Sequence, residues 1–236
     1  MSISVLYEDN HLIAVNKNAG DITQGDKTGD TPLPDKVKVW LKEKYNKPGN
    51  VFCGVIHRLD RPTSGVVLFA KTSKALTRMN ALFRTKEVEK IYWAIVEKKP
   101  TKKEDTLINF LAKNDKQNKS YISNESNPKA KKAILHYHCI GESDRYALLE
   151  IALETGRHHQ IRCQLSNAGM VIKGDLKYGA NRSNKDSSIS LHARYLYFTH
   201  PVSKEKIAIS AHPPKDNLWD YFSENNSSNH VNSKNS

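Results

Sequence analysis

Hydrophobic and polar positions alternate along this chain in short blocks, a pattern that predicts many strands with a few helices between them. Residues 3–7 and 12–16 are apolar-rich runs separated by four polar residues, which predicts a hairpin. Residues 133–140 and 145–153 flank a polar turn in the same way and predict a second hairpin. Residues 88–97 are apolar on both faces, so we expect this strand in the centre of a covered sheet. The other expected strands are 66–70, 189–199 and 207–210.

Apolar residues spaced three or four apart predict three helices between these strands. The first opens at Thr31-Pro32, with Thr31 as its N-cap and an apolar face that starts at Leu33. The second begins at a cap formed by Ser73, and the third spans residues 158–168. Because several strands are adjacent in sequence and few helices separate them, we expect an α+β fold rather than a doubly wound one.

Two segments depart from this pattern. Residues 101–132 hold eight lysines against four acidic residues with weak periodicity, so we expect a polar loop or mobile excursion between two ordered halves. Residues 223–236 include ten Ser or Asn out of fourteen, which predicts a disordered tail. We therefore expect one domain over residues 1–222 and a Ser/Asn-rich tail over residues 223–236.

Composition narrows the class of protein. The 236 residues include 37 Lys+Arg against 25 Asp+Glu, a net charge of +12, which indicates either a polyanionic partner or a solvated lysine surface. Apolar runs are short, and no basic region precedes one at the N-terminus, so neither a membrane span nor a signal peptide is expected. Three widely spaced cysteines indicate reduced thiols in a cytoplasmic protein rather than disulfides or a zinc site.

The segment from residue 54 to residue 71 has the highest density of polar and charged groups that could carry chemistry. It is a polar loop between apolar segments, where functional residues commonly lie. Arg58 and Arg61 flank Asp60, so we expect its carboxylate to stay ionised and to act as a nucleophile or base rather than as an acid. A salt-bridged surface turn explains the same residues without chemistry, and the local composition leaves both interpretations open.

A second cluster of polar residues covers positions 153–162. If its helix begins near Gly156, His158 and Arg162 share one face, and the basic helix N-terminus suits a phosphate or a carboxylate. A solvated helix face accounts for the histidines equally well. Arg162 follows the inward-facing Ile161 and is the better candidate for a buried ion pair.

Several segments resemble, in order along the chain, those of the RluA-type pseudouridine synthases. His57-Arg58-Leu59-Asp60 is similar to the family's signature, together with Thr63-Ser64-Gly65 and Ala70-Lys71. The resemblance covers residues 3–212, and its specificity comes from the order of the pieces rather than from any single one. The other similar segments are residues 9–17 and 90–94, residues 155–162, Gly174-Asp175, Tyr178-Gly179, Leu191-His192-Ala193 and His200-Pro201.

This resemblance implies the pseudouridine synthase fold, with a central mixed, mostly antiparallel sheet flanked by helices and loops. It also implies an isomerase that breaks the uridine N1–C1′ bond, turns the base over and rejoins it through C5. Asp60 would be the essential carboxylate, acting at C1′ as a nucleophile or at C2′ as a base, and the sequence does not choose between the two. Tyr92 would stack on the uracil and help to remove the C5 proton, and Arg162 would pair with Asp60.

The resemblance also implies contacts to the RNA. An enzyme that acts on a stacked base must extrude it, and we expect Arg58 to enter the space that the base vacates. Leu191 would form part of the apolar floor under the base. His57, Arg61 and Lys71 are the other expected substrate-binding residues, and the implied chemistry calls for no metal and no organic cofactor.

The chain differs from the family pattern in a few places. Asn18 stands where proline is usual, and His158 stands where threonine or lysine is usual. Many members carry an N-terminal S4 domain, whereas this chain starts on the catalytic domain, so target choice would rest on that domain and on the 101–132 segment. The expected target is a stem-loop of rRNA or tRNA, bound by a monomer, because proteins read RNA sequence mostly in loops and ends.

Two other functions fit parts of the sequence. An RNA-binding or assembly protein could keep this fold without turnover, but the presence of Asp60, Tyr92 and Arg162 together argues against it. A nuclease could use His57 and Asp60 as metal ligands, since they are three residues apart, yet no third ligand stands out nearby. The sequence names neither the RNA nor the uridine.

Overall fold

The computed structural model describes residues 3–25 and 29–226, which belong to two compact units. Unit 1 combines Met1–Ile91 with His192–His212, and unit 2 combines Tyr92–Leu191 with Pro213–Ser236. The chain passes from unit 1 to unit 2 between Ile91 and Tyr92, inside the strand over residues 89–96. It returns to unit 1 between Leu191 and His192, at the start of the strand over residues 191–199. The division therefore does not fall in the 101–132 segment, where a break between two ordered halves was expected.

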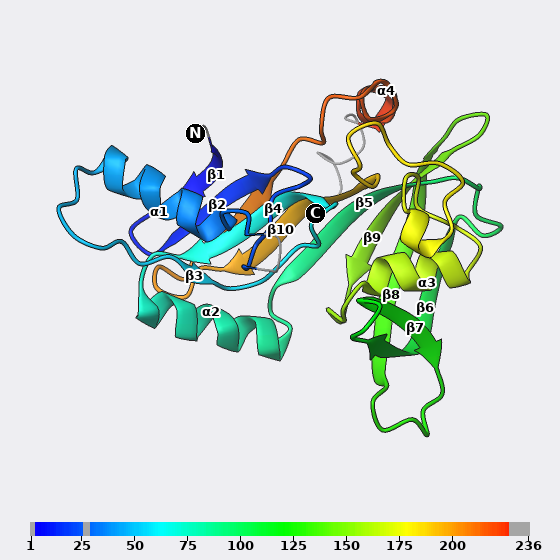
Figure 1. Ribbon diagram of the computed structural model, residues 1–236, viewed down its shortest axis with the longest axis horizontal. Coiled ribbons are helices and arrows are strands. Elements are labelled where there is room, and N and C mark those ends of the chain that lie inside the picture. Colours follow the sequence, from blue (N-terminus) through cyan, green and yellow to red (C-terminus); the bar gives the residue numbers. More distant parts are fainter. Residues whose placement is uncertain (1–2, 26–28, 227–236) are drawn as a thin grey trace. The chain divides into compact units, whose positions relative to one another are not determined.

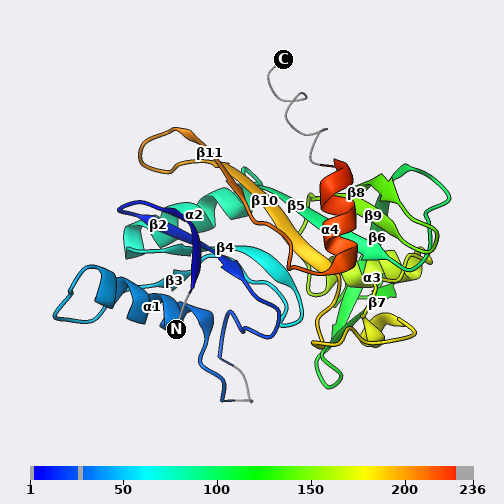
Figure 2. The same ribbon diagram turned by 90° about the horizontal axis from the view of Figure 1, so that it is seen from above.

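Unit 1 contains a mixed sheet with helices on both sides. Strand β4 has β2 and β10 as neighbours, and it is parallel to β10 and antiparallel to β2. The pairs β1–β2, β3–β4 and β10–β11 are antiparallel. The strands are β1 (Ser4–Glu8), β2 (Leu12–Lys17), β3 (Gly54–Val55), β4 (Ser64–Ala70), β10 (Leu191–Thr199) and β11 (Lys206–Ser210). Strand β10 belongs to unit 1 from His192 onward. The helices are α1 (Leu33–Lys44) and α2 (Ser73–Thr85), which lie on opposite sides of β2 and β4 (Figures 1 and 2).

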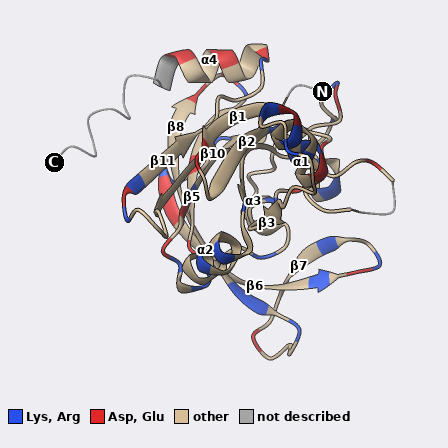
Figure 3. Cartoon of the chain, turned by 90° about the vertical axis from the view of Figure 1, so that its left-hand side faces the viewer, with Lys and Arg blue, Asp and Glu red and all other residues tan. Residues whose placement is uncertain are grey.

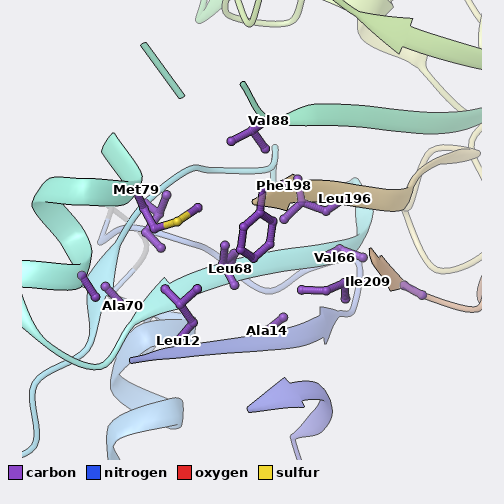
Figure 4. Packing of buried hydrophobic residues seen from close by; sticks show 13 residues of the cluster. Leu12, Ala14, Val66, Leu68, Ala70, Met79, Val88, Leu196, Phe198 and Ile209 are labelled. Carbon is purple, nitrogen blue, oxygen red and sulfur yellow. The ribbon is translucent and has the colours of Figure 1, made fainter. Parts of the chain in front are cut away.

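The central strands of unit 1 are covered on both faces. Every residue of β4 is buried, which explains the continuous apolar run over its residues 66–70. On one face, Leu12 of β2 and Val66 and Leu68 of β4 pack in a cluster with Met79 of α2 and Phe198 of β10 (Figure 4). This packing holds β4 firmly at the point where the loop containing Asp60 ends.

The helices of unit 1 begin close to the predicted positions, but their caps differ by one residue. Pro32, not Thr31, is the N-cap of α1, and no side chain caps this helix. Thr72, not Ser73, caps α2, because its hydroxyl accepts a hydrogen bond from the amide of Ala75 at 3.1 Å. Thr72 and Ser73 are both good N-cap residues, so only the backbone, which is extended at Thr72, decides which one serves.

Unit 2 contains a second set of strands, in the order β5-β9-β8-β6-β7. The pairs β8–β9, β6–β8 and β6–β7 are all antiparallel. The strands are β5 (Glu89–Val96, of which Tyr92 onward belongs to this unit), β6 (Glu104–Asn114), β7 (Lys119–Ser123), β8 (Lys131–Glu142) and β9 (Ala147–Leu153). The helices are α3 (Gln160–Asn167), the short 3₁₀ helix η1 (Leu176–Tyr178) and α4 (Asn217–Asn226).

The lysine-rich 101–132 segment is mainly a β-hairpin, so the expectation of a polar loop or mobile excursion is wrong. Strands β6 and β7 pair from Phe110 and Ser123 to Asn114 and Lys119, and β6 also pairs with β8 along eight residues. Only two residues of these strands are buried, and lysines occur on both strands (Figure 3). Because the buried positions are few, the alternation typical of strands is weak in the sequence.

Helix α4 reaches four residues into the segment that was expected to be a disordered tail. Trp219 and Phe222 are buried in a cluster with Trp93, Ile95 and Leu148, and this contact stabilises the helix. Residues 223–226 are therefore helical, so the predicted boundary between the domain and the tail at residue 222 lies four residues too early. The remainder of the predicted tail, residues 227–236, lies outside the described residues.

The two units together confirm the predicted α+β class with a mixed, mostly antiparallel arrangement of strands and flanking helices. Cys53, Cys139 and Cys163 are buried free thiols, as their spacing predicted. Within the part of the chain that the structure describes, the helices are too short or too polar to cross a membrane.

Candidate active site

Asp60 begins a tight turn in the loop between β3 and β4. The amide of Thr63 donates to the carbonyl of Asp60 at 3.0 Å, which closes a turn of four residues. Leu59, immediately before the turn, is buried, and its carbonyl accepts a hydrogen bond from the hydroxyl of Thr23 at 3.3 Å. The loop is thus anchored inside unit 1, while Asp60 itself is only half-buried.

The side chain of a buried lysine binds backbone carbonyls of this turn. Lys17, at the end of β2, is 1% exposed, and its ammonium group donates to the carbonyls of Asn18 (2.9 Å), Arg61 (3.0 Å) and Thr63 (2.7 Å). The three acceptors match the three N–H donors of an ammonium group, which makes burial of the charge tolerable. Burial lowers the pKa of Lys17 to about 8, so it is protonated at neutral pH. The backbone on both sides of Pro62 is therefore held by one interior charge.

Two of the expected RNA contacts in unit 1 are exposed. Arg58 Nη1 donates to Gln24 Oε1 at 2.8 Å, and Arg61 pairs with Asp30. Both arginines flank Asp60 in the sequence, and their side chains lie at the surface of the loop. Their placement is compatible with the predicted role of contacting RNA.

The other two expected contacts in unit 1, His57 and Lys71, have hydrogen-bond partners within the unit. Nε2 of His57 accepts a hydrogen bond from the amide of Leu68 at 3.0 Å, and its ring stacks on Phe83. Burial lowers the pKa of His57 to about 3, so it stays neutral. Lys71 has a side chain only 10% exposed, and its ammonium lies 2.7 Å from Glu8 Oε1. Both groups form hydrogen bonds inside unit 1, and their role as substrate contacts stays a prediction.

Tyr92 and Leu191 belong to unit 2 and are both buried. Tyr92 lies in β5 and is 8% exposed, and the strand stays buried from there to Val96. Leu191 is 4% exposed and is the first residue of β10, directly before the chain returns to unit 1. An aromatic and an aliphatic side chain of this kind are suited to contact a flat base.

Arg162 forms a buried ion pair, as the sequence predicted, and its partner in unit 2 is Asp175. The carboxylate accepts from Arg162 Nε at 2.7 Å and from Nη2 at 2.8 Å, a two-point contact that fixes the plane of the guanidinium. Arg162 is 5% exposed and Asp175 is 1% exposed. The guanidinium carbon also lies 5.1 Å from the ring centre of Tyr178. The predicted pair with Asp60 joins two different units and stays a prediction.

The N-terminus of α3 is tied to the β6–β7 hairpin. The hydroxyl of Ser120 donates to the carbonyl of His158 at 2.6 Å, and its amide donates to the Tyr178 hydroxyl at 2.9 Å. Helix α3 starts at Gln160, after His159 in a left-handed conformation, so His158 precedes the helix and does not share a helical face with Arg162. The hairpin therefore stabilises the helix that carries Arg162.

Three buried polar residues near these groups were not assigned a role from the sequence. Lys17 and Asp175 lie inside the segments that resemble the family, and so does His192, which is fully buried. A lysine at the end of an apolar strand and an aspartate after Gly174 are weak signals by themselves. Asp175 binds Arg162, 13 residues away, whereas Lys17 binds Thr63 and His192 binds Ser64, 46 and 128 residues away, so no local pattern reveals these contacts.

Comparison with known proteins identifies the family. The family model described as RNA pseudouridylate synthase matches residues 11–167. The chain is 30% identical over 224 residues to ribosomal large subunit pseudouridine synthase D of Zymomonas mobilis, covering 91% of this chain and 70% of that protein. It is 34% identical over 230 residues to tRNA pseudouridine synthase C of Haemophilus ducreyi, covering 89% of this chain and 91% of that protein.

Solved structures agree on the fold. Human RNA pseudouridylate synthase domain containing 4 superimposes with a TM-score of 0.76 at 23% identity, covering 95% of this chain and 93% of that chain. The chain therefore belongs to the RluA-type family of RNA pseudouridine synthases, which are isomerases that convert uridine to pseudouridine in RNA. This result supports the enzyme over the alternative of an RNA-binding protein without turnover.

Proposed function

We propose that this enzyme isomerises a uridine in structured rRNA or tRNA, with Asp60 as the essential carboxylate. The N1–C1′ bond breaks, the base turns over, and a C5–C1′ bond forms while C5 loses its proton and N1 gains one. Asp60 acts either at C1′ as a nucleophile or at C2′ as a base. No water enters this reaction, so one carboxylate suffices where glycoside hydrolysis usually uses two.

The observation that carries this proposal is the way the Asp60 turn is built. Its backbone is tied down by Lys17 through the carbonyls of Arg61 and Thr63 and by Thr23 through the carbonyl of Leu59. A reacting group must be held within about 0.5 Å of its productive position. A half-buried carboxylate on a turn with a buried support suits that requirement better than a mobile surface loop does.

Tyr92 and Arg162 would complete the chemistry. We assign Tyr92 to stacking on the uracil and to removal of the C5 proton, which an unperturbed phenol with a pKa near 10 does poorly without help from its surroundings. We assign Arg162 to pairing with Asp60, which would keep the carboxylate ionised and aimed. Asp175 supports this role, because its two-point contact fixes the orientation of the guanidinium.

Binding of RNA would use the exposed basic side chains of unit 1. Arg58 would enter the space of the extruded base, and Arg61 would contact the phosphate backbone. Lys74 and Arg78 on the exposed side of α2 would also contact the phosphate backbone. Contacts of this kind release counterions, so affinity should fall steeply with salt concentration.

The names of the relatives support the proposed substrate class. One relative is named for the large ribosomal subunit and another for tRNA, so both RNAs are candidate substrates for this chain. We propose a stem-loop as the target, because sequence in RNA is read mostly where bases are unpaired. We also propose that the enzyme works as a monomer in the cytoplasm, where both RNAs occur and free thiols persist.

A genetic complementation experiment tests the function. Pseudouridines are mapped across total rRNA and tRNA from cells that lack the gene, and from the same cells supplied with wild type, Asp60→Asn or Asp35→Asn. Wild type should restore at least one lost site, and Asp60→Asn should lower its formation by at least about 10³-fold. Asp35→Asn is the matched control, since Asp35 pairs with Lys38 on the exposed side of α1.

The outcomes separate the alternatives. Restoration of the site by Asp60→Asn would remove Asp60 from the catalytic role. If no site disappears in the deletion strain, the proposed rRNA or tRNA substrate is wrong. Normal growth of the Asp60→Asn strain without the modification would favour a binding role for the protein beside its enzymatic one.

A further inference from the structure

A fully buried histidine joins three segments of unit 1. His192, near the start of β10, is 0% exposed. Its Nδ1 lies 2.8 Å from the hydroxyl of Ser64 on β4, and its Nε2 lies 3.0 Å from the carbonyl of Ala211, just after β11. The imidazole thus connects the first residue of β4 to the end of the last strand.

The partners determine which ring nitrogen carries the proton. The carbonyl of Ala211 can only accept a hydrogen bond, so Nε2 must be the donor. Nδ1 of the neutral ring is then an acceptor, and the hydroxyl of Ser64 donates to it. Burial lowers the pKa of His192 to about 4, so this arrangement persists at neutral pH. Every polar atom of the ring is satisfied.

Ser64 is placed where it can control the Asp60 turn. It follows Thr63, whose amide closes the turn onto the carbonyl of Asp60. Ser64 also lies opposite His192 in the short parallel pair between β4 and β10. The next pair in this register, Gly65 with Ala193, brings the two backbones so close that a Cβ on Gly65 would lie 2.3 Å from the carbonyl oxygen of Ala193.

The other supports of this turn act on different atoms. Lys17 holds the carbonyls of Arg61 and Thr63 from the side of β2. The hydroxyl of Ser64 is a side-chain contact between the end of the turn and β10. Leu191, proposed to lie under the base, directly precedes His192 in the chain. A shift at His192 would therefore reach both the Asp60 turn and Leu191, the residue proposed to contact the base.

We propose that His192 is a positioning residue for the isomerisation, acting through its hydrogen bond with Ser64 to hold the Asp60 turn in register with β10. The proposal rests on the proposed role of Asp60. A misplacement of about 1 Å can lower a rate about 10²-fold. Loss of this hydrogen bond should therefore lower the rate of the chemical step more than it weakens RNA binding, which depends on surface cations.

The variants are chosen to break the same hydrogen bond from either side. Ser64→Ala removes the donor, His192→Leu removes the acceptor at similar volume, and His192→Asn keeps an acceptor near the position of Nδ1. His200→Leu is the matched control. His200 is another buried histidine, directly after the far end of β10, where its Nδ1 accepts from the amide of Ser203 at 2.9 Å.

The measurement is the single-turnover rate of pseudouridine formation with excess enzyme on total rRNA and tRNA from the deletion strain. It is made well below the melting temperature of every variant, together with the apparent Kd for the same RNA. Ser64→Ala and His192→Leu should each slow turnover about 10-fold to 100-fold with Kd changed less than threefold. Their double variant should be no slower than the slower single variant, and His192→Asn should recover part of the rate. His200→Leu should lower the melting temperature and leave the rate unchanged.

Two results would overturn the positioning role. One is turnover by folded Ser64→Ala and His192→Leu within twofold of wild type. The other is an equal loss of rate in His200→Leu, which would make the effect a general consequence of losing a buried histidine. Asp60→Asn is measured in the same series to keep the two proposals apart. Turnover at the wild-type rate by Asp60→Asn would contradict the proposed function. Loss of turnover in Asp60→Asn together with wild-type turnover in Ser64→Ala would contradict only the role of His192.

Discussion

At the scale of single residues, two cations in the described part of the chain, Lys17 and Arg162, are buried, and each has a different kind of hydrogen-bond acceptor. Lys17 has three backbone carbonyls around its ammonium, and Arg162 has the carboxylate of Asp175 along one edge of its guanidinium. The point charge of lysine suits acceptors from several directions, whereas the planar fork of arginine suits a carboxylate. Each cation therefore supports a segment that the proposed mechanism uses.

The pair of Arg162 and Asp175 leads to a prediction about stability. Asp175→Asn removes a two-point carboxylate contact from a guanidinium that is 5% exposed, so we expect the free energy of unfolding to fall by about 3 kcal/mol. Urea unfolding at pH 7 measures the change. Asp105→Asn is the control in the same unit, because Asp105 pairs with the exposed Lys102 and should change stability little. Equal stability of the two variants would show that the buried pair contributes nothing net.

At the scale of secondary-structure elements, the parallel contact between β4 and β10 depends on one glycine. Gly65 has a φ of +115° and would place a Cβ 2.5 Å from the backbone nitrogen of Ala193. A side chain there would be strained by its own backbone and would push the strands apart. The signature around Asp60 thus contains a residue needed for packing, beside those proposed for chemistry.

Substitution of Gly65 tests that dependence. Gly65→Ala should lower the melting temperature by much more than Gly169→Ala, or prevent soluble expression. Gly169 also has a positive φ, +76°, but nothing lies within 4 Å of a Cβ placed there. The control should therefore lose only the about 1–2 kcal/mol of an alanine in the left-handed region. Thermal unfolding of both proteins decides, and equal melting temperatures would refute the close approach of β4 and β10.

The β6–β7 hairpin shows why the sequence pattern does not predict every strand. Leu111 and Ser120 are the buried residues of its two strands, and the other strand residues are half-buried or exposed. Ser120 is buried because its amide, hydroxyl and carbonyl bind Tyr178 and His158, not because it is apolar. A strand held by polar contacts to another element carries little of the hydrophobic alternation on which strand prediction relies.

At the scale of the whole molecule, buried neutral histidines should make the protein sensitive to acid. Burial lowers the pKa of His192 to about 4 and that of His57 to about 3, against 6.5 for an unperturbed histidine. Between about pH 6.5 and pH 4 the unfolded chain binds protons at these positions and the folded chain does not. The free energy of unfolding should therefore decrease as the pH falls through this window.

Urea unfolding between pH 4.5 and pH 7.5 checks this prediction. The loss of stability on acidification should be smaller in His192→Asn than in wild type, because the variant lacks one of the groups that protonate on unfolding. Arg194 and His212 are the charged or titratable groups whose positive charge further disfavours protonation of His192. The same pH dependence in both proteins would contradict the assignment.

Much of the molecule was determined by the sequence itself. Alternating and continuous apolar runs predicted the two hairpins, the buried strand β5 and the positions of α1, α2 and α3 to within a few residues. The order of the motifs around Asp60, Tyr92 and Arg162 predicted the family that the comparisons then established. These features are local, because each depends on side chains that are neighbours along one strand, helix or loop.

Tertiary structure alone decided which polar groups meet. The acceptors of Lys17 at Arg61 and Thr63, the contact of His192 with Ser64 and the pairing of Arg162 with Asp175 join segments 13 to 128 residues apart. It also gave His57 and Lys71, two of the expected RNA contacts, hydrogen-bond partners inside unit 1. The physical reason is common to all of them: a buried polar atom must find a partner, and the chain supplies that partner only after distant strands and helices have packed together.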